Sequence, residues 1–125
     1  MKENSKKILI VEDDEALLKA VVQKLKIKGY DIFMARSVSE ADNIFKSEKI
    51  DALWLDHYLV GKESGLDLVV KIREGKNNSN IPIFVVTNSS SNEKMRSYLK
   101  LGVKKYYIKV SVSLAQVIAD IEDVI

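Results

Sequence analysis

Residues 8–15 read Ile-Leu-Ile-Val-Glu-Asp-Asp-Glu, an uninterrupted apolar run followed at once by four acidic residues. A short run of this kind, rich in β-branched residues, is typical of a strand that is buried on both faces. Such strands belong mainly to parallel sheets that helices cover on each side. The acidic residues would then lie at the carboxyl end of the strand, which is the edge where open α/β sheets bind ligands. The stretch therefore predicts a fold class and the edge of the sheet that carries a site.

Short apolar runs and helical stretches alternate along the rest of the chain. Further strands are predicted over residues 30–35, 52–55, 81–86 and 106–108. A stretch with helical spacing of its apolar residues follows each strand. Five strands alternating with five helices predict an α/β protein with a parallel sheet. A doubly wound sheet is favoured because a barrel would need more units, but periodicity does not fix the strand order.

Helix boundaries are indicated by serine caps and by glycines. The first helix is predicted from the stripe Leu17, Leu18, Val21, Val22 and Leu25, and it ends near Gly29. A capping box is predicted for Ser37 with Glu40, Ser90 with Glu93 is predicted to cap the fourth helix, and Ser113 with Gln116 to begin the last. Gly102 ends the fourth helix, and residues 75–80 are rich in turn formers.

The composition predicts one soluble globular domain over residues 1–125, with residues 1–6 flexible. Lys and Arg number 20 against 18 Asp and Glu, which argues against direct nucleic-acid binding by net charge. The chain contains no cysteine, so disulfides, thiolate zinc sites and a cysteine nucleophile are excluded. No apolar stretch is long enough for a signal peptide or a membrane span, and we expect a cytoplasmic protein without a membrane partner.

Chemically active residues follow four of the predicted strands. Glu12 and Asp13 follow the first, Asp56 the third, Thr87 the fourth and Lys109 the fifth. Because the carboxyl ends of parallel strands share one edge, these side chains converge in one crevice if the first and third strands are neighbours.

Converging carboxylates need a cation, because two of them about 4 Å apart repel by roughly 4 kcal/mol at an effective dielectric constant of 20. A set of oxygen ligands suits Mg²⁺, with Mn²⁺ as a second fit. Lys109 and Thr87 are then suited to bind a phosphoryl group by charge and by hydrogen bonding. Asp56 would be the nucleophile, since a carboxylate accepts a phosphoryl group as an acyl phosphate.

The sequence resembles the receiver domains of bacterial response regulators over nearly its whole length. Residues 8–15 are similar to the first strand and acidic pocket of that family, and residues 52–56 to the strand that leads to the phosphoacceptor. Residues 65–68, 82–87 and 106–109 resemble the start of the following helix, the hydroxyl strand and the lysine strand. The resemblance implies a flavodoxin-like sheet in the order 2-1-3-4-5.

The resemblance also implies a role for each site residue. Asp56 would be the phosphoacceptor, and Thr87 and Lys109 would contact the phosphoryl group. Tyr106 would be the aromatic switch residue whose rotamer follows phosphorylation together with Thr87. The metal ligands would be Glu12, Asp13, Asp56 and the backbone carbonyl of Tyr58, with Asp13 the more direct of the acidic pair.

The function implied is a phosphorylation switch in two-component signalling. A histidine kinase or a histidine phosphotransfer protein would supply the phosphoryl group. The surface of the fourth helix, fifth strand and fifth helix would then change, and an unknown output protein would respond; homodimerisation on phosphorylation is a further implied partnership. The protein would not be a turnover enzyme, because the acceptor is its own Asp56, although slow autodephosphorylation fits the same site.

Some residues depart from the family pattern. Val110 stands where proline is usual, Asn88 replaces a small residue, and residues 61–64 lengthen the loop after Asp56. These changes favour an alternative, a pseudo-receiver that binds proteins without phosphorylation. A flavin carrier would need a phosphate-binding loop after the first strand, which this sequence lacks. A dehalogenase-type phosphatase would need an aspartate where Tyr58 stands. For His57, the only histidine, we expect an orienting or surface role.

Overall fold

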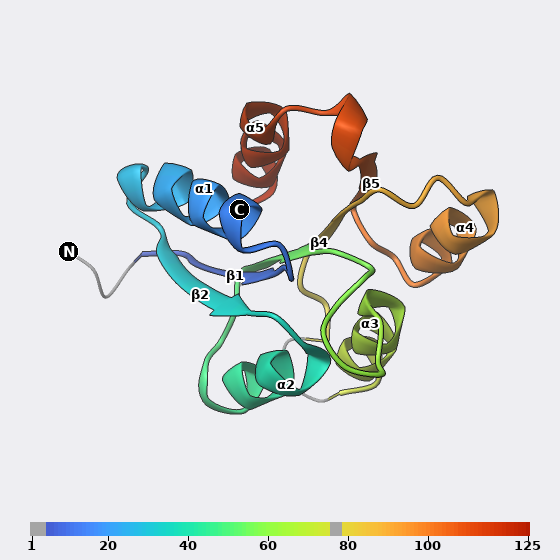
Figure 1. Cartoon of the computed structure of the whole chain (residues 1–125). Helices are drawn as coiled ribbons and strands as arrows, with labels where there is room; N and C mark the ends of the chain where they lie inside the picture. Colours follow the sequence, from blue (N-terminus) through green and yellow to red (C-terminus); the bar gives the residue numbers. More distant parts are fainter. Residues whose placement is uncertain (1–4, 76–78) are drawn as a thin grey trace.

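One parallel sheet forms the centre of the molecule, with its strands in the order β2-β1-β3-β4-β5 (Figure 1). The computed structural model describes residues 5–75 and 79–125. In this part of the chain the strands are β1 Lys7–Val11, β2 Asp31–Ala35, β3 Ala52–Leu55, β4 Ile83–Thr87 and β5 Lys105–Ile108. The predicted strands and the order implied by the resemblance are confirmed.

Helices cover both faces of this sheet (Figure 1). The described residues form α1 Glu15–Ile27, α2 Val38–Ser47, α3 Gly65–Glu74, α4 Asn92–Lys100 and α5 Leu114–Val124, with a 3-10 turn at Lys109–Ser111. Helices α1 and α5 pack on one face, and α2, α3 and α4 pack on the other. None of the helices in residues 5–75 and 79–125 is both long and apolar enough to cross a bilayer.

The strands are apolar on both sides because each side has its own core. On β3, Leu53 and Leu55 face α2 and α3, while Ala52 and Trp54 face α1 and α5. All four side chains are fully buried. Trp54 is the only tryptophan, so its fluorescence reports the packing of the second core.

The predicted N-cap residues Ser37 and Ser113 are confirmed, whereas the one predicted for α4 is not. The hydroxyl of Ser91, not of Ser90, accepts a hydrogen bond from the N–H of Lys94 and caps α4. Residues 89–91 are all serines, so the sequence offers more than one possible N-cap residue. The one that is used depends on where the chain leaves β4. The Ser90 prediction was wrong by one residue.

Two further caps differ in detail from the prediction. Ser37 caps α2, but the Glu40 carboxylate accepts a hydrogen bond from the N–H of Arg36 at 2.9 Å. A complete capping box that the sequence reading missed opens α3, where Ser64 and Asp67 bond each other's backbone N–H. The flexible segment predicted over residues 1–6 and the turn over 75–80 fall partly on residues 1–4 and 76–78, outside the described residues.

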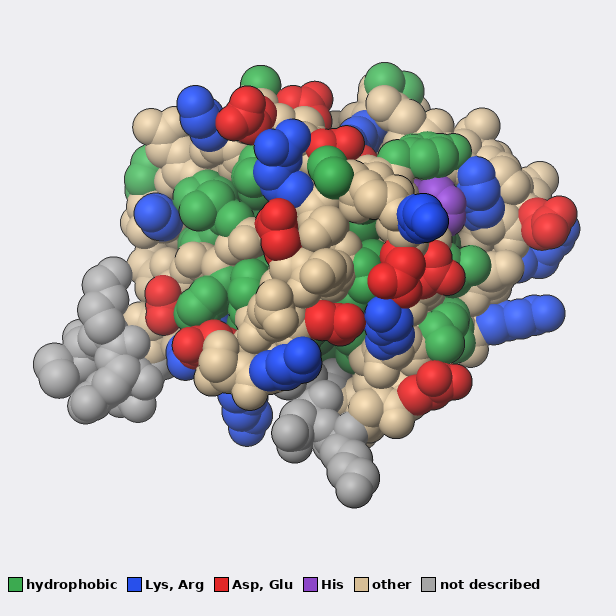
Figure 2. Space-filling view, turned by 60° about the horizontal axis from the view of Figure 1, so that its bottom comes forward, with side chains coloured by type: hydrophobic (Ala, Val, Ile, Leu, Met, Phe, Trp, Pro, Cys, Tyr) green, Lys and Arg blue, Asp and Glu red, His purple; other side chains and the backbone are tan. Residues whose placement is uncertain are grey.

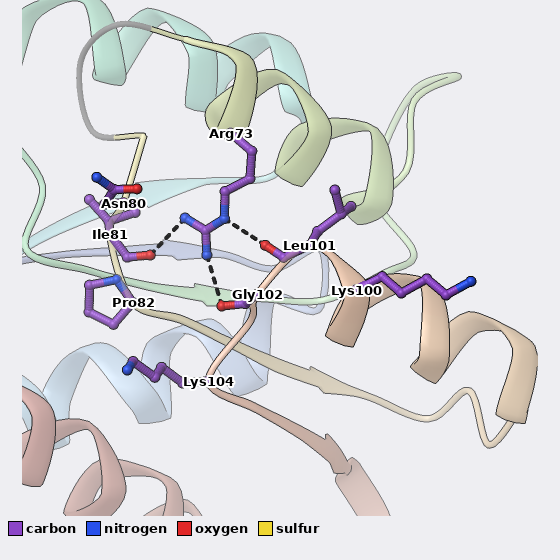
Figure 3. A pocket seen from close by; sticks show the side chains of 8 residues that line it. All are labelled: Arg73, Asn80, Ile81, Pro82, Lys100, Leu101, Gly102 and Lys104. Atoms are coloured by element: carbon purple, nitrogen blue, oxygen red, sulfur yellow. Dashed lines mark hydrogen bonds between the residues drawn. The ribbon is translucent and has the colours of Figure 1, made fainter.

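Arg73, near the end of α3, joins three segments at the edge of the sheet opposite the carboxyl ends (Figure 3). Its guanidinium donates hydrogen bonds to four backbone carbonyls, which belong to Leu101 at 2.7 Å, Ser79 at 2.9 Å, Ile81 at 3.0 Å and Gly102 at 3.1 Å. We call this group the Arg73 clamp. It fastens α3 to the segment just before β4 and to the turn between α4 and β5.

Two tyrosine hydroxyls fasten α5 to the sheet. The Tyr30 hydroxyl donates to Glu122 at 3.0 Å, and the Tyr107 hydroxyl donates to Asp120 at 2.6 Å. Burial, helped by the hydrogen bond to Glu122, raises the pKa of Tyr30 to about 12. Burial and the Asp120 carboxylate also raise the pKa of Tyr107.

These shifts predict a staged titration of the tyrosines. Tyr30, Tyr98 and Tyr107, whose pKa values are raised mainly by burial, should stay neutral well above the ordinary value of 10.0. Tyr58 should ionise before these three, because hydrogen bonds from Lys94 and Ser89 lower its pKa. The stability owed to the three raised groups is complete below pH 10 and lost as pH rises through their folded pKa values. Absorbance at 295 nm and urea midpoints from pH 8 to 12 check this; a single phase near pH 10 would contradict it.

Candidate phosphoacceptor site

The residues that follow the strands meet at the carboxyl edge of the sheet, as predicted. Val11 of β1 lies opposite Leu55 of β3, which places the next residues, Glu12 and Asp56, side by side. The Asp56 N–H donates to the Val11 carbonyl at 3.0 Å and holds the acceptor beside β1. On the other side, Thr87 of β4 lies opposite Ile108 of β5, and Lys109 follows.

Lys109 holds the two buried carboxylates of this edge together. Its Nζ lies 2.8 Å from Asp56 Oδ2 and 3.0 and 3.1 Å from the two oxygens of Glu12. The Lys109, Asp56 and Glu12 side chains are 18%, 7% and 0% exposed, so little water screens them. Val110 is exposed beside them and does not prevent Lys109 from reaching Asp56.

Burial is the largest single influence on the pKa values of Glu12 and Lys109. Burial raises the pKa of Glu12, and the Asp56 charge raises it further, against the lowering effects of the Asp14 N–H and Lys109. For Lys109 burial lowers the pKa, but the hydrogen bonds to Asp56 and Glu12 outweigh burial and raise it. The ammonium is therefore fully charged at neutral pH and compensates the two carboxylates.

Asp13 does not join this buried group. Its side chain is about half exposed, and Arg36 Nη2 lies 3.3 Å from both Asp13 Oδ1 and the Asp13 carbonyl. The acidic pair thus divides, with Glu12 facing Lys109 and Asp13 facing Arg36. In the part of the chain that the structure describes, no three His, Cys, Asp or Glu side chains approach closely enough to hold a metal by themselves.

The donor atoms at this edge fit Mg²⁺ in their chemistry. They are oxygens, and Glu12 Oε1 accepts no hydrogen bond although it lies 3.0 Å from the Lys109 ammonium, so it keeps a lone pair for a cation. Glu12, Asp13, Asp56 and the Tyr58 carbonyl would hold the ion. The assignment of these ligands remains a prediction.

Thr87 and Tyr106, the expected switch residues, are linked through Ser89. Thr87 is fully buried, and its Oγ1 accepts a hydrogen bond from the Ser89 N–H at 3.4 Å. The Tyr106 hydroxyl donates to the Ser89 carbonyl at 2.7 Å. A change in the loop after β4 therefore acts on both residues at once, although their switching remains a prediction.

Sequence reasoning missed the contacts of His57. The side chain is 8% exposed, and Figure 2 shows it as a small purple area flanked by basic side chains. His57 Nδ1 and the fully buried Tyr98 hydroxyl share a hydrogen bond of 2.6 Å. Tyr58 points outward, and Lys94 donates to its hydroxyl at 3.0 Å. The sequence signal that was available, two ring-bearing residues directly after Asp56, did not identify these partners on α4.

Comparison with known proteins agrees with this geometry. Residues 8–122 match the family model of the response regulator receiver domain. A chemotaxis protein CheY homolog of Campylobacter jejuni is 30% identical over 82% of this chain and 80% of its own length. A CheY-like receiver domain protein of Methanospirillum hungatei superposes with a TM-score of 0.87 at 26% identity, covering 96% of this chain and 93% of its own.

Two other similarities bear on the fold and on the length of the chain. The receiver domain of the sensor histidine kinase PA1611 of Pseudomonas aeruginosa has the same fold, with a TM-score of 0.82 at 21% identity over 96% of this chain and 97% of its own. That domain has a magnesium ion coordinated in its active site cleft. The chain spans less than half the length of three curated relatives that are transcriptional regulators.

Proposed function

The chain belongs to the family of response regulator receiver domains, and from this premise we propose that it is a phosphorylation switch with Asp56 as its phosphoacceptor. Receiver domains of this family act in two-component signalling. The observation that carries the proposal is the contact of Lys109 Nζ with Asp56 Oδ2 at 2.8 Å, beside buried Glu12 and Thr87.

The side chains at this edge supply what phosphoryl transfer needs. An Asp56 carboxylate oxygen attacks phosphorus, an acyl phosphate bond forms, and the bond from phosphorus to the donor nitrogen or oxygen breaks, with the electron pair leaving on the donor. Lys109 compensates the charge on the phosphoryl oxygens, and the Thr87 hydroxyl donates to one of them. A bound Mg²⁺ would neutralise further phosphoryl charge. Positioning and charge are the main contributions asked of the protein.

The partners follow from the same proposal. A histidine kinase or a histidine phosphotransfer protein in the cytoplasm supplies the phosphoryl group. Movement of the loop after β4 and of Tyr106 changes the surface formed by α4, β5 and α5, which an output protein or a second copy of the chain binds. The substrate is the domain's own side chain, so it is a signalling component and not a turnover enzyme.

Intact-mass spectrometry after incubation with acetyl phosphate and Mg²⁺ tests the proposal. We expect one phosphoryl adduct on the wild-type chain, and none in the Asp56→Asn variant or with EDTA. Asp67→Asn, at the start of α3, is a matched control that should still be labelled. If the wild-type chain stays unlabelled while another receiver domain is labelled in parallel, the pseudo-receiver alternative replaces this proposal.

A further inference from the structure

Two consecutive residues of the phosphoacceptor loop, which we define as residues 56–58, contact one face of α4. His57 bonds Tyr98, and Tyr58 accepts from Lys94. Lys94 and Tyr98 are four residues apart, so they lie one above the other on the same side of the helix. The Lys94 ammonium also lies 5.0 Å from the centre of the Tyr58 ring. The loop that carries Asp56 is therefore held to α4 at two points.

Of the two contacts, the one between His57 and Tyr98 is the more tightly packed. Tyr98 is fully buried, and its ring meets that of His57 edge to face, with centroids 5.7 Å apart. Either histidine tautomer completes the bond, because a tyrosine hydroxyl can both donate and accept a hydrogen bond. A short bond between buried groups is lost only at the cost of leaving a polar atom unsatisfied.

Gly65, the first residue of α3, packs closely against the contact between His57 and Tyr98. Its N–H donates to the His57 carbonyl at 2.9 Å. A methyl group at Gly65 would overlap the Asp56 carbonyl and lie 2.9 Å from the Tyr98 hydroxyl oxygen. With α3 packed this closely behind the loop, a displacement of Tyr98 cannot be absorbed by the loop moving back. It must either break the bond to His57 or move the backbone of Asp56.

We propose that Tyr98 is a positioning residue, whose hydroxyl couples the location of α4 to the geometry of the phosphoacceptor loop through His57. This inference rests on the proposed function. The coupling is reciprocal, so a phosphoryl group on Asp56 shifts α4 and the position of α4 shifts the reactivity of Asp56. The route runs along the loop after β3 and meets the one that links Thr87 and Tyr106 through Ser89, because the Tyr98 and Tyr106 ring centroids lie 5.7 Å apart.

The test compares Tyr98→Phe with Tyr107→Phe, which removes a tyrosine hydrogen bond of the same length, 2.6 Å, on β5. Hydrogen exchange of residues 92–100 is measured before and after labelling with acetyl phosphate and Mg²⁺, with adduct formation followed by mass. In the Tyr98→Phe protein we expect α4 amides to exchange about fivefold faster before labelling. The change that labelling causes there should shrink by about the same factor, while α1 and α5 behave as in the wild type.

Two more variants separate coupling from a structural role. His57→Asn keeps a hydrogen-bonding atom near the place of Nδ1 and should retain the wild-type response of α4, whereas His57→Leu should behave like Tyr98→Phe. If Tyr98→Phe forms the adduct and α4 responds as in the wild type, or if Tyr107→Phe shows the same loss, the coupling is overturned and the proposed function stands. If the wild-type chain forms no adduct, the proposed function fails and the coupling fails with it.

Discussion

Replacing Lys109 with methionine should make the stability of the fold depend on Mg²⁺ at neutral pH. The substitution removes the cation between Asp56 and Glu12 and leaves two buried carboxylates facing each other. Breaking a buried ion pair on one side costs about 3–5 kcal/mol, and the slight exposure of Lys109 favours the lower value. Loss of its contact to the phosphoryl group should also slow labelling by acetyl phosphate about a hundredfold.

Urea unfolding followed by Trp54 fluorescence, in EDTA and in Mg²⁺, measures the first effect. Added Mg²⁺ should raise the free energy of unfolding more in the variant than in the wild type, because it replaces the missing charge. The difference in free energy of unfolding between the wild type and the Lys109→Met variant should also become smaller at low pH. The folded-state pKa of Glu12 is already raised by burial, and without Lys109 it rises further, so a proton stabilises the folded variant below that pKa.

Lys109→Arg is the matched control, since it keeps a permanent charge at the same position. It should retain most of the stability in EDTA. A Lys109→Met protein as stable in EDTA as the wild type at pH 8 would show that the two carboxylates do not repel each other in the folded chain.

Replacing Arg73 with methionine should destabilise the protein by about 3 kcal/mol, well above the typical cost of about 1 kcal/mol for a point substitution. Methionine keeps most of the apolar stem but leaves four carbonyls of the Arg73 clamp without their donor. Figure 3 shows the bonds to Leu101, Ile81 and Gly102. Hydrogen bonds to a charged group contribute about 1.5–3 kcal/mol each, and sharing one donor group reduces their sum.

Arg96→Met, at an exposed arginine on α4, is the control and should change the free energy of unfolding by less than about 0.5 kcal/mol. Because the clamp lies at the edge of the sheet opposite Asp56, the folded Arg73→Met protein should still be labelled by acetyl phosphate at low temperature. An equal, small effect of both substitutions would show that the carbonyls are satisfied by water once the guanidinium is gone.

The alternation of apolar runs and helical stripes was sufficient to predict every strand and α-helix of the described chain, but not the 3-10 turn at Lys109–Ser111. The reason is that strands buried on both faces, such as Ile8–Val11 and Ala52–Leu55, must be continuously apolar, whereas helices bury one stripe. The polar residues directly after those strands were also placed correctly at one edge, because parallel strands end together. Strand order came from the family resemblance, since the apolar pattern is the same whichever strands are neighbours.

Only the tertiary structure decided which side chains meet. His57 and Tyr98 are 41 residues apart, Asp13 and Arg36 are 23, and Arg73 and Leu101 are 28. Each pair depends on the reach and direction of side chains from separately placed elements, and no local periodicity records that. The same holds for the choice of Ser91 over Ser90 as a cap. The sequence was enough to bring Asp56, Glu12, Thr87 and Lys109 to one edge, because backbone topology controls where strands end; packing between distant segments controls what holds that edge in place.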